Sequence, residues 1–127
     1  MKKTNPYKQA IAYYWDNHPL TLTRQARLCR EFAESLDAYI VEEYMDIGAE
    51  RTQLKRLIDR IQQHQVDYVM VSSLTALGEG KQRVETQDRI MLTGTKLAVV
   101  GIDAVFEIKD GRSDRPESAT STKGGQT

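Results

Sequence analysis

Hydrophobic residues along this chain alternate between two kinds of periodic segment. Residues 10–15 form a short apolar and aromatic run, closed by the turn-forming letters DNHP, and predict a first strand. Its aromatic letters, YYW, are expected to be core and sheet residues rather than a base-stacking platform. From Thr21 or Thr23, either of which would be the N-cap, apolar residues at spacings of three and four predict an amphipathic helix. The apolar set is Leu22, Ala26, Cys29, Ala33 and Leu36.

The next two units repeat the order of strand and helix. Residues 38–45 are β-branched and aromatic, which is typical of a strand, and the turn DIGAER leads into a second helix. The apolar face of that helix consists of Leu54, Leu57, Ile58 and Ile61. Residues 66–71, VDYVMV, are almost continuously apolar, as expected for a parallel strand covered on both faces. A weaker pattern predicts a third helix over residues 81–92.

Two further strands close the periodic part of the chain. Residues 93–102 contain a turn and a fourth strand, and residues 104–108 predict a fifth. The connection between them is too short for a parallel crossover, so the fifth strand should run antiparallel to the fourth at the sheet edge. The sequence therefore predicts an α/β fold, a three-layer sandwich with a mostly parallel five-stranded sheet whose last strand is antiparallel.

A chain of 127 residues has room for one domain with one hydrophobic core. We expect an N-terminal extension over residues 1–9 and the α/β domain over residues 10–109. Residues 110–127 lack periodicity and have few apolar residues, which predicts a disordered polar tail. Within the domain, the first strand should lie centrally, and the loops after the first three strands should converge at one edge of the sheet.

Charge and cysteine content narrow the classes of function. The 18 basic and 18 acidic residues cancel, which argues against a domain that grips nucleic acid by bulk charge but leaves a local basic face open. The single cysteine, Cys29, is expected to be a buried core residue in a reducing compartment. His18 and His64 lie far apart, so no metal-ligand cluster is visible. Without a signal peptide or membrane span, the sequence predicts a cytoplasmic protein with no cofactor or metal.

The segment after the third strand, VSSLTALGEG, places little reactive chemistry where ligands usually gather in such folds. Ser72 and Ser73 have neither an obvious base nor a nucleophile elbow. Asp16, Asp46 and Glu79 follow or end three different strands and offer a carboxylate cluster for Mg²⁺. Such a site usually needs adjacent acids after the first strand, where this chain has a single aspartate.

Three stretches, taken with the order of elements, resemble the N-terminal catalytic domain of the serine recombinases, the resolvase and invertase family. YYWDN falls where the family has Y-x-R-V-S, and Gln25 matches a glutamine near the start of the family's first helix. DIGAERTQL is similar to D-x-G-x-S-G-x-x-x-R-P-x-L, with the Ser-Gly pair deleted and Thr52 in place of proline. The residues that match this second motif are Asp46, Gly48, Arg51 and Leu54. LTALGE corresponds to L-D-R-L-x-R, and the resemblance extends over about residues 10–108.

The resemblance implies that the family's chemistry is missing here. In the family a serine attacks a DNA phosphodiester and forms a phosphoserine link, while arginines neutralise the charge on the phosphoryl oxygens. By the resemblance, Asn17 takes the place of the serine and Trp15 that of the first arginine, and Ala76 and Glu79 replace the later pair. An amide forms no phosphoester, and a carboxylate repels phosphate. We therefore expect a catalytically inactive resolvase-like domain, reused as a regulatory or protein-interaction module.

Retained family-like residues are Gln25, Asp46 and Arg51, and no residue is assigned as catalytic. Two alternatives stay open. One is a DNA strand-exchange recombinase or nuclease with displaced residues, in which Ser72, Ser73 or a tyrosine is the nucleophile and Arg51 the phosphate clamp. The other is a small-molecule or Mg²⁺-binding domain of flavodoxin-like architecture. We expect a protein partner and no membrane association, while a homodimer and weak association with nucleic acid stay open.

Overall fold

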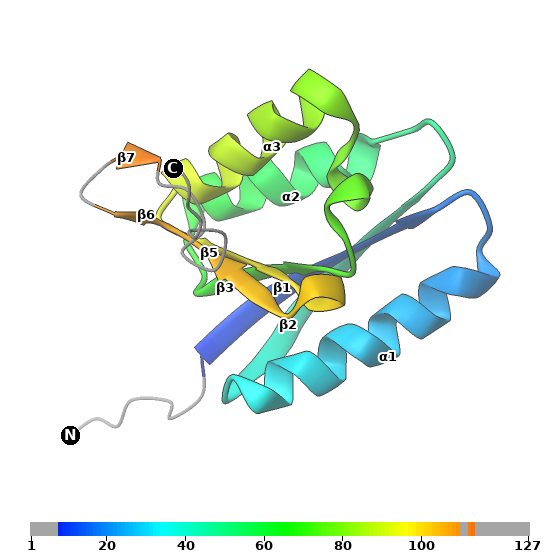
Figure 1. Ribbon diagram of the computed structural model, residues 1–127, viewed down its shortest axis with the longest axis horizontal. Coiled ribbons are helices and arrows are strands. Elements are labelled where there is room, and N and C mark those ends of the chain that lie inside the picture. The colour runs from blue at the N-terminus through cyan, green and yellow to red at the C-terminus, as the bar shows by residue number, and fades with distance from the viewer. Residues whose placement is uncertain (1–7, 110–111, 114–127) are drawn as a thin grey trace.

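A five-stranded sheet in the order β2-β1-β3-β4-β5 forms the centre of the computed structural model, which describes residues 8–109 and 112–113 (Figure 1). The strands are β1 (Lys8–Asp16), β2 (Ala38–Ile47), β3 (Tyr68–Val71), β4 (Lys96–Val99) and β5 (Ala104–Phe106). The helices are α1 (Leu20–Ser35), α2 (Thr52–Gln63) and α3 (Gly80–Leu92). Two short 3₁₀ helices, η1 (Leu74–Leu77) and η2 (Val100–Ile102), follow β3 and β4.

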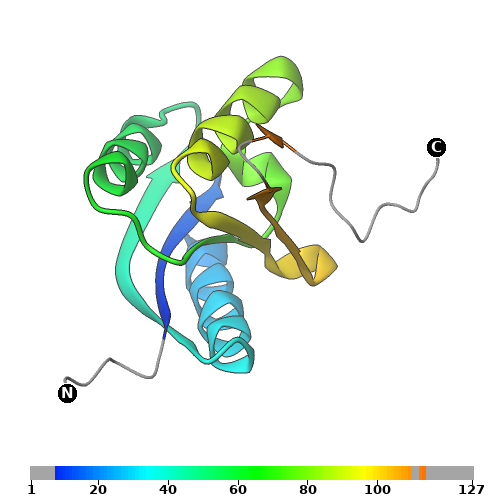
Figure 2. The same ribbon diagram turned by 90° about the vertical axis from the view of Figure 1, so that its left-hand side faces the viewer.

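The predicted topology is confirmed. Neighbouring strands from β2 to β4 are parallel, and β5 runs antiparallel to β4 at the edge. The first strand lies inside the sheet, between β2 and β3, so the chain order reverses beside it. In Figures 1 and 2, α1 covers one face of the sheet, and α2 and α3 cover the other. None of the helices within residues 8–109 is long and apolar enough to cross a membrane.

Side chains of β1 alternate between two hydrophobic clusters, one on each face of the sheet. Ile11 and Tyr13 pack with α2 and α3, whereas Ala10, Ala12 and Tyr14 pack with α1. This is the period of two that a strand imposes on its side chains. All five are fully buried, which explains why the run reads as continuously apolar in the sequence.

Several predicted boundaries differ from the structure. The threonine N-cap is wrong, because α1 begins at Leu20 after Pro19 and no side chain caps it. Proline fixes a φ angle suited to the start of a helix, so the turn can begin without a side-chain cap. Thr21 is already inside the first turn, where its hydroxyl donates to the carbonyl oxygen of His18 at 3.0 Å. The first strand begins at Lys8, inside the stretch expected to be an extension.

The segment expected to be a disordered tail contains a short strand. β7 (Arg112–Ser113) pairs antiparallel with β6 (Ile108–Lys109), which follows β5 as a separate element. The other residues of that expected tail, and residues 1–7 of the expected extension, lie outside the described residues.

A close crossing fixes the end of β3. The backbone N–H of Gly101, in η2, donates to the carbonyl oxygen of Ser72 at 2.8 Å. A Cβ atom at position 101 would lie 2.6 Å from that oxygen, so only glycine fits without a shift of the backbone. The turn after β4 therefore holds the segment after β3 in place.

Candidate functional site

The carboxyl ends of β1, β2 and β3 bring together residues that are far apart in the sequence. Tyr13 and Trp15 lie on β1, Trp15 lies opposite Asp46 on β2, and the β2–α2 turn and η1 supply Arg51 and Ala76. We call this group the Trp15–Arg51 cluster; it consists of Tyr13, Trp15, Asp46, Arg51 and Ala76. Figure 1 shows the loops after these three strands at the same end of the sheet.

Asp46 fixes the start of α2. Its buried carboxylate accepts hydrogen bonds from the backbone N–H groups of Gln53 and Leu54, both at 3.1 Å. A carboxylate at this position satisfies N–H groups that the helix itself leaves unpaired and interacts favourably with the helix dipole. The Tyr13 hydroxyl donates a third hydrogen bond, at 2.8 Å, so Asp46 ties β1 to β2 and α2.

Tyr13 stays protonated at neutral pH. Burial is the main cause that raises the pKa of its hydroxyl, and the hydrogen bond to the Asp46 carboxylate raises it further. A neutral phenol donates a hydrogen bond to the carboxylate and is a weak nucleophile. Tyr13 is therefore placed to position Asp46, and the geometry gives it no role as an attacking group.

Arg51 joins three segments through one guanidinium. Its central carbon lies 4.4 Å from the centroid of the Trp15 ring, a cation–π contact. Nη1 donates to the backbone carbonyl oxygen of Ala76 in η1 and, at 3.4 Å, to the Tyr13 hydroxyl. Among the described residues Arg51 makes no ion pair with a carboxylate. Its charge is instead offset by a ring face and by oxygen dipoles.

Three hydrogen bonds fix the side chain and the backbone of Trp15. The indole N–H donates to the carbonyl oxygen of Gly48, at 2.6 Å. The Gln25 side-chain amide bonds both backbone groups of Trp15, accepting from its N–H at 3.1 Å and donating to its carbonyl at 2.8 Å. The Gln25 amide thus pairs with the end of β1 as a neighbouring strand would. This pairing fixes the backbone of Trp15, whose indole contacts Arg51.

Asn17 and Glu79 remain outside the cluster. Both are exposed, and no side-chain hydrogen bond or ion pair within residues 8–109 connects either one to it. The backbone N–H of Asn17 donates to the Asp16 carboxylate at 2.6 Å. The Thr21 hydroxyl lowers the pKa of that carboxyl group most, and the N–H groups of His18 and Asn17 add to the effect.

The serines after β3 have no activating partner. The Ser73 hydroxyl lies 2.7 Å from the Thr75 hydroxyl, and the Ser72 carbonyl accepts from Gly101. Within the described part of the chain, no histidine, amine or carboxylate bonds either serine hydroxyl. Leu77 is fully buried in the hydrophobic core on the α2–α3 face of the sheet, and Leu74 packs against that core, so both leucines anchor this loop.

The expected alternative of a carboxylate cluster for Mg²⁺ is not supported by the positions of its members. Across residues 8–109 and 112–113, no three histidine, cysteine, aspartate or glutamate residues lie close enough to hold a metal ion. Asp46 is committed to the α2 N-terminus, and Glu79 precedes α3 as an exposed residue. Cys29 is buried as predicted, and burial raises the pKa of its thiol to about 12.

Two polar groups on the edge strand β2 were missed by the sequence analysis. Glu43 accepts from the Tyr14 hydroxyl at 2.7 Å and from two nitrogens of Arg30 on α1. Glu42, on the opposite face, accepts from the Tyr44 hydroxyl at 2.7 Å and from Arg60 of α2 at 2.9 Å. Tyr14 and Tyr44, which both lie on strands, were the signal in the sequence that could have revealed these glutamates, because a phenol inside a fold needs a hydrogen-bond partner.

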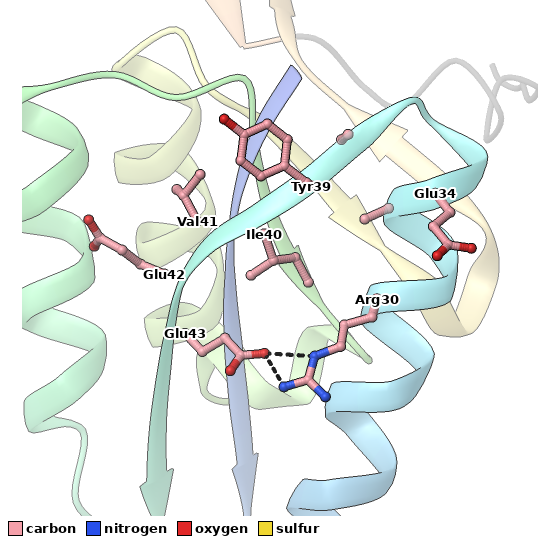
Figure 3. Close-up of a pocket in the computed structure, with 9 residues that line it drawn as sticks. Arg30, Glu34, Tyr39, Ile40, Val41, Glu42 and Glu43 are labelled. Atoms are coloured by element: carbon pink, nitrogen blue, oxygen red, sulfur yellow. Dashed lines mark hydrogen bonds and ion pairs between the residues drawn. The ribbon is translucent and has the colours of Figure 1, made fainter. Parts of the chain in front are cut away.

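A shallow pocket of about 460 Å³ lies between α1 and the amino half of β2. Figure 3 shows the side chains of Arg30 and Glu43 joined within it, with Tyr39 and Glu34 along its length. The pocket lies beside the opposite half of β2 from Asp46, and it contains no member of the Trp15–Arg51 cluster.

The chain belongs to the resolvase family, because a sequence model described as "Resolvase, N terminal domain" matches residues 16–115. It is thus a resolvase-type domain of the serine recombinase class, as the resemblance in the sequence indicated. A comparison with curated proteins gave no match.

Solved structures show the same fold. The N-terminal catalytic domain of TP901-1 integrase aligns with a TM-score of 0.70 and 19% identity, over 82% of this chain and 85% of that one. A resolvase family site-specific recombinase from Streptococcus pneumoniae gives 0.66 and 23%, over 77% and 76%. The C-terminal catalytic domain of ISC1926 TnpA, an IS607-like serine recombinase, gives 0.64 and 21%, over 72% and 69%.

Proposed function

We propose that this resolvase-type domain does not carry out strand transfer and serves as a regulatory or protein-interaction module. In this view the protein has the fold of the family and lacks the family's strand-transfer reaction. It also takes the domain to extend over residues 10–109 and the protein to be cytoplasmic, which agrees with a single buried cysteine.

The engagement of Arg51 carries the proposal. By the family resemblance this arginine would hold a phosphate, yet its guanidinium stacks on Trp15 and donates to a backbone carbonyl and a tyrosine hydroxyl. Nη1 is engaged by both oxygens, so a phosphate held through that nitrogen would have to displace them, and the Ala76 carbonyl would then lack this hydrogen bond. The Arg51 side chain therefore links β1 to η1.

The residues at the other positions named by the family resemblance support the same conclusion. Asn17, at the position of the family's serine, has an amide nitrogen whose lone pair is delocalised, so it forms no phosphoester. Glu79 and Ala76 supply no cation to a phosphoryl group, and a carboxylate near phosphate is unfavourable. The serines Ser72 and Ser73 have no base within hydrogen-bond distance in the described residues, so displaced catalysis has no geometric support.

A cleavage assay tests the proposal. The purified protein is incubated with negatively supercoiled plasmid, and covalent protein–DNA adducts are sought on denaturing gels. We expect neither nicking nor adduct above the level of an Asn17→Ala, Ser72→Ala, Ser73→Ala triple variant, with circular dichroism showing that both proteins are folded. A covalent adduct formed by the unaltered protein would overturn the proposal; its loss in the triple variant would assign the nucleophile to these three residues, and its persistence would point to a tyrosine.

A further inference from the structure

We draw no further inference here: the strongest candidate, the patch of exposed apolar side chains that Met45 and Ile47 form on the edge strand β2, carries no proposal, because nothing in the described part of the structure shows what covers it.

Discussion

At the scale of single residues, Arg51 shows how one side chain can hold several segments of a fold together. Its contacts reach β1 through Trp15 and Tyr13, and η1 through the Ala76 carbonyl. Ala76 is itself buried, so the carbonyl depends on protein donors.

We predict that Arg51→Met destabilises the protein by about 1–3 kcal/mol. The substitution keeps the apolar stem and removes one cation–π contact together with the hydrogen bond to the Ala76 carbonyl. Urea unfolding followed by circular dichroism measures the change. Lys55→Met, on the exposed face of α2, is the matched control and should change stability by no more than about 0.5 kcal/mol. Equal effects of the two substitutions would show that the guanidinium contacts contribute little.

The residues of this cluster were identified by the sequence only in part. The motif similarity pointed to Trp15, Asp46 and Arg51, but not to the contacts among them. Trp15 meets Asp46 through the pairing register of two strands, and Arg51 meets Ala76 across a separation of 25 residues. Such contacts depend on tertiary placement, which local patterns do not encode. Tyr13 was expected to be a plain core residue, and its hydroxyl became the link between Asp46 and Arg51.

At the scale of elements, β2 is the strand that polar interactions secure most clearly. Each face of this edge strand carries a glutamate bound to a tyrosine and to an arginine of the helix on that face. These polar interactions compensate for the edge position of β2, because within the described residues the strand has a sheet neighbour on one side only. The hydrophobic pattern predicted the strand correctly, whereas charged pairs across a helix and a strand leave no periodic signal in the sequence.

The Tyr14–Glu43 hydrogen bond predicts a dependence of stability on alkaline pH. Burial, followed by the bond to Glu43, raises the pKa of the Tyr14 hydroxyl above its ordinary value near 10. The stabilisation that this shift represents is complete below pH 10. It is lost as the pH rises from there toward the folded-state pKa, because the unfolded chain releases the proton first.

Tyr14→Phe should therefore flatten the decline of unfolding free energy above about pH 10. One group contributes at most about 1.4 kcal/mol per pH unit to that slope. Urea unfolding at several pH values between about 9 and 12 gives the slopes of the two proteins. Parallel declines would mean that Tyr14 titrates in the folded protein as it does in the unfolded chain.

At the scale of the whole molecule, two hydrophobic clusters cover the two faces of the sheet, and the same strands contribute residues to both. β1 sends alternate residues into the α1 cluster and into the α2–α3 cluster, and β3 does the same with Met70 and Val69. Loss of either cluster would therefore expose residues of the strands that form the other. This order of layers was predicted from the alternation of strand and helix, because crossover rules fix where each helix goes. The β6–β7 pair was not predicted, because strands of two residues are too short to show a periodic pattern.

We expect the protein to unfold in a single cooperative transition. Trp15, the only tryptophan, reports on the carboxyl edge, and circular dichroism reports on all helices, so their unfolding curves should coincide. Leu57→Ala, a truncation of a fully buried side chain on α2, should lower stability by about 2–5 kcal/mol and move both curves together. Leu28→Ala, on the exposed side of α1, is the control and should cost less than about 1 kcal/mol. If Leu57→Ala shifted the circular dichroism curve and left the Trp15 curve in place, the cluster at the strand ends would be a separate folding unit, and its link through β1 to the α2–α3 core would be refuted.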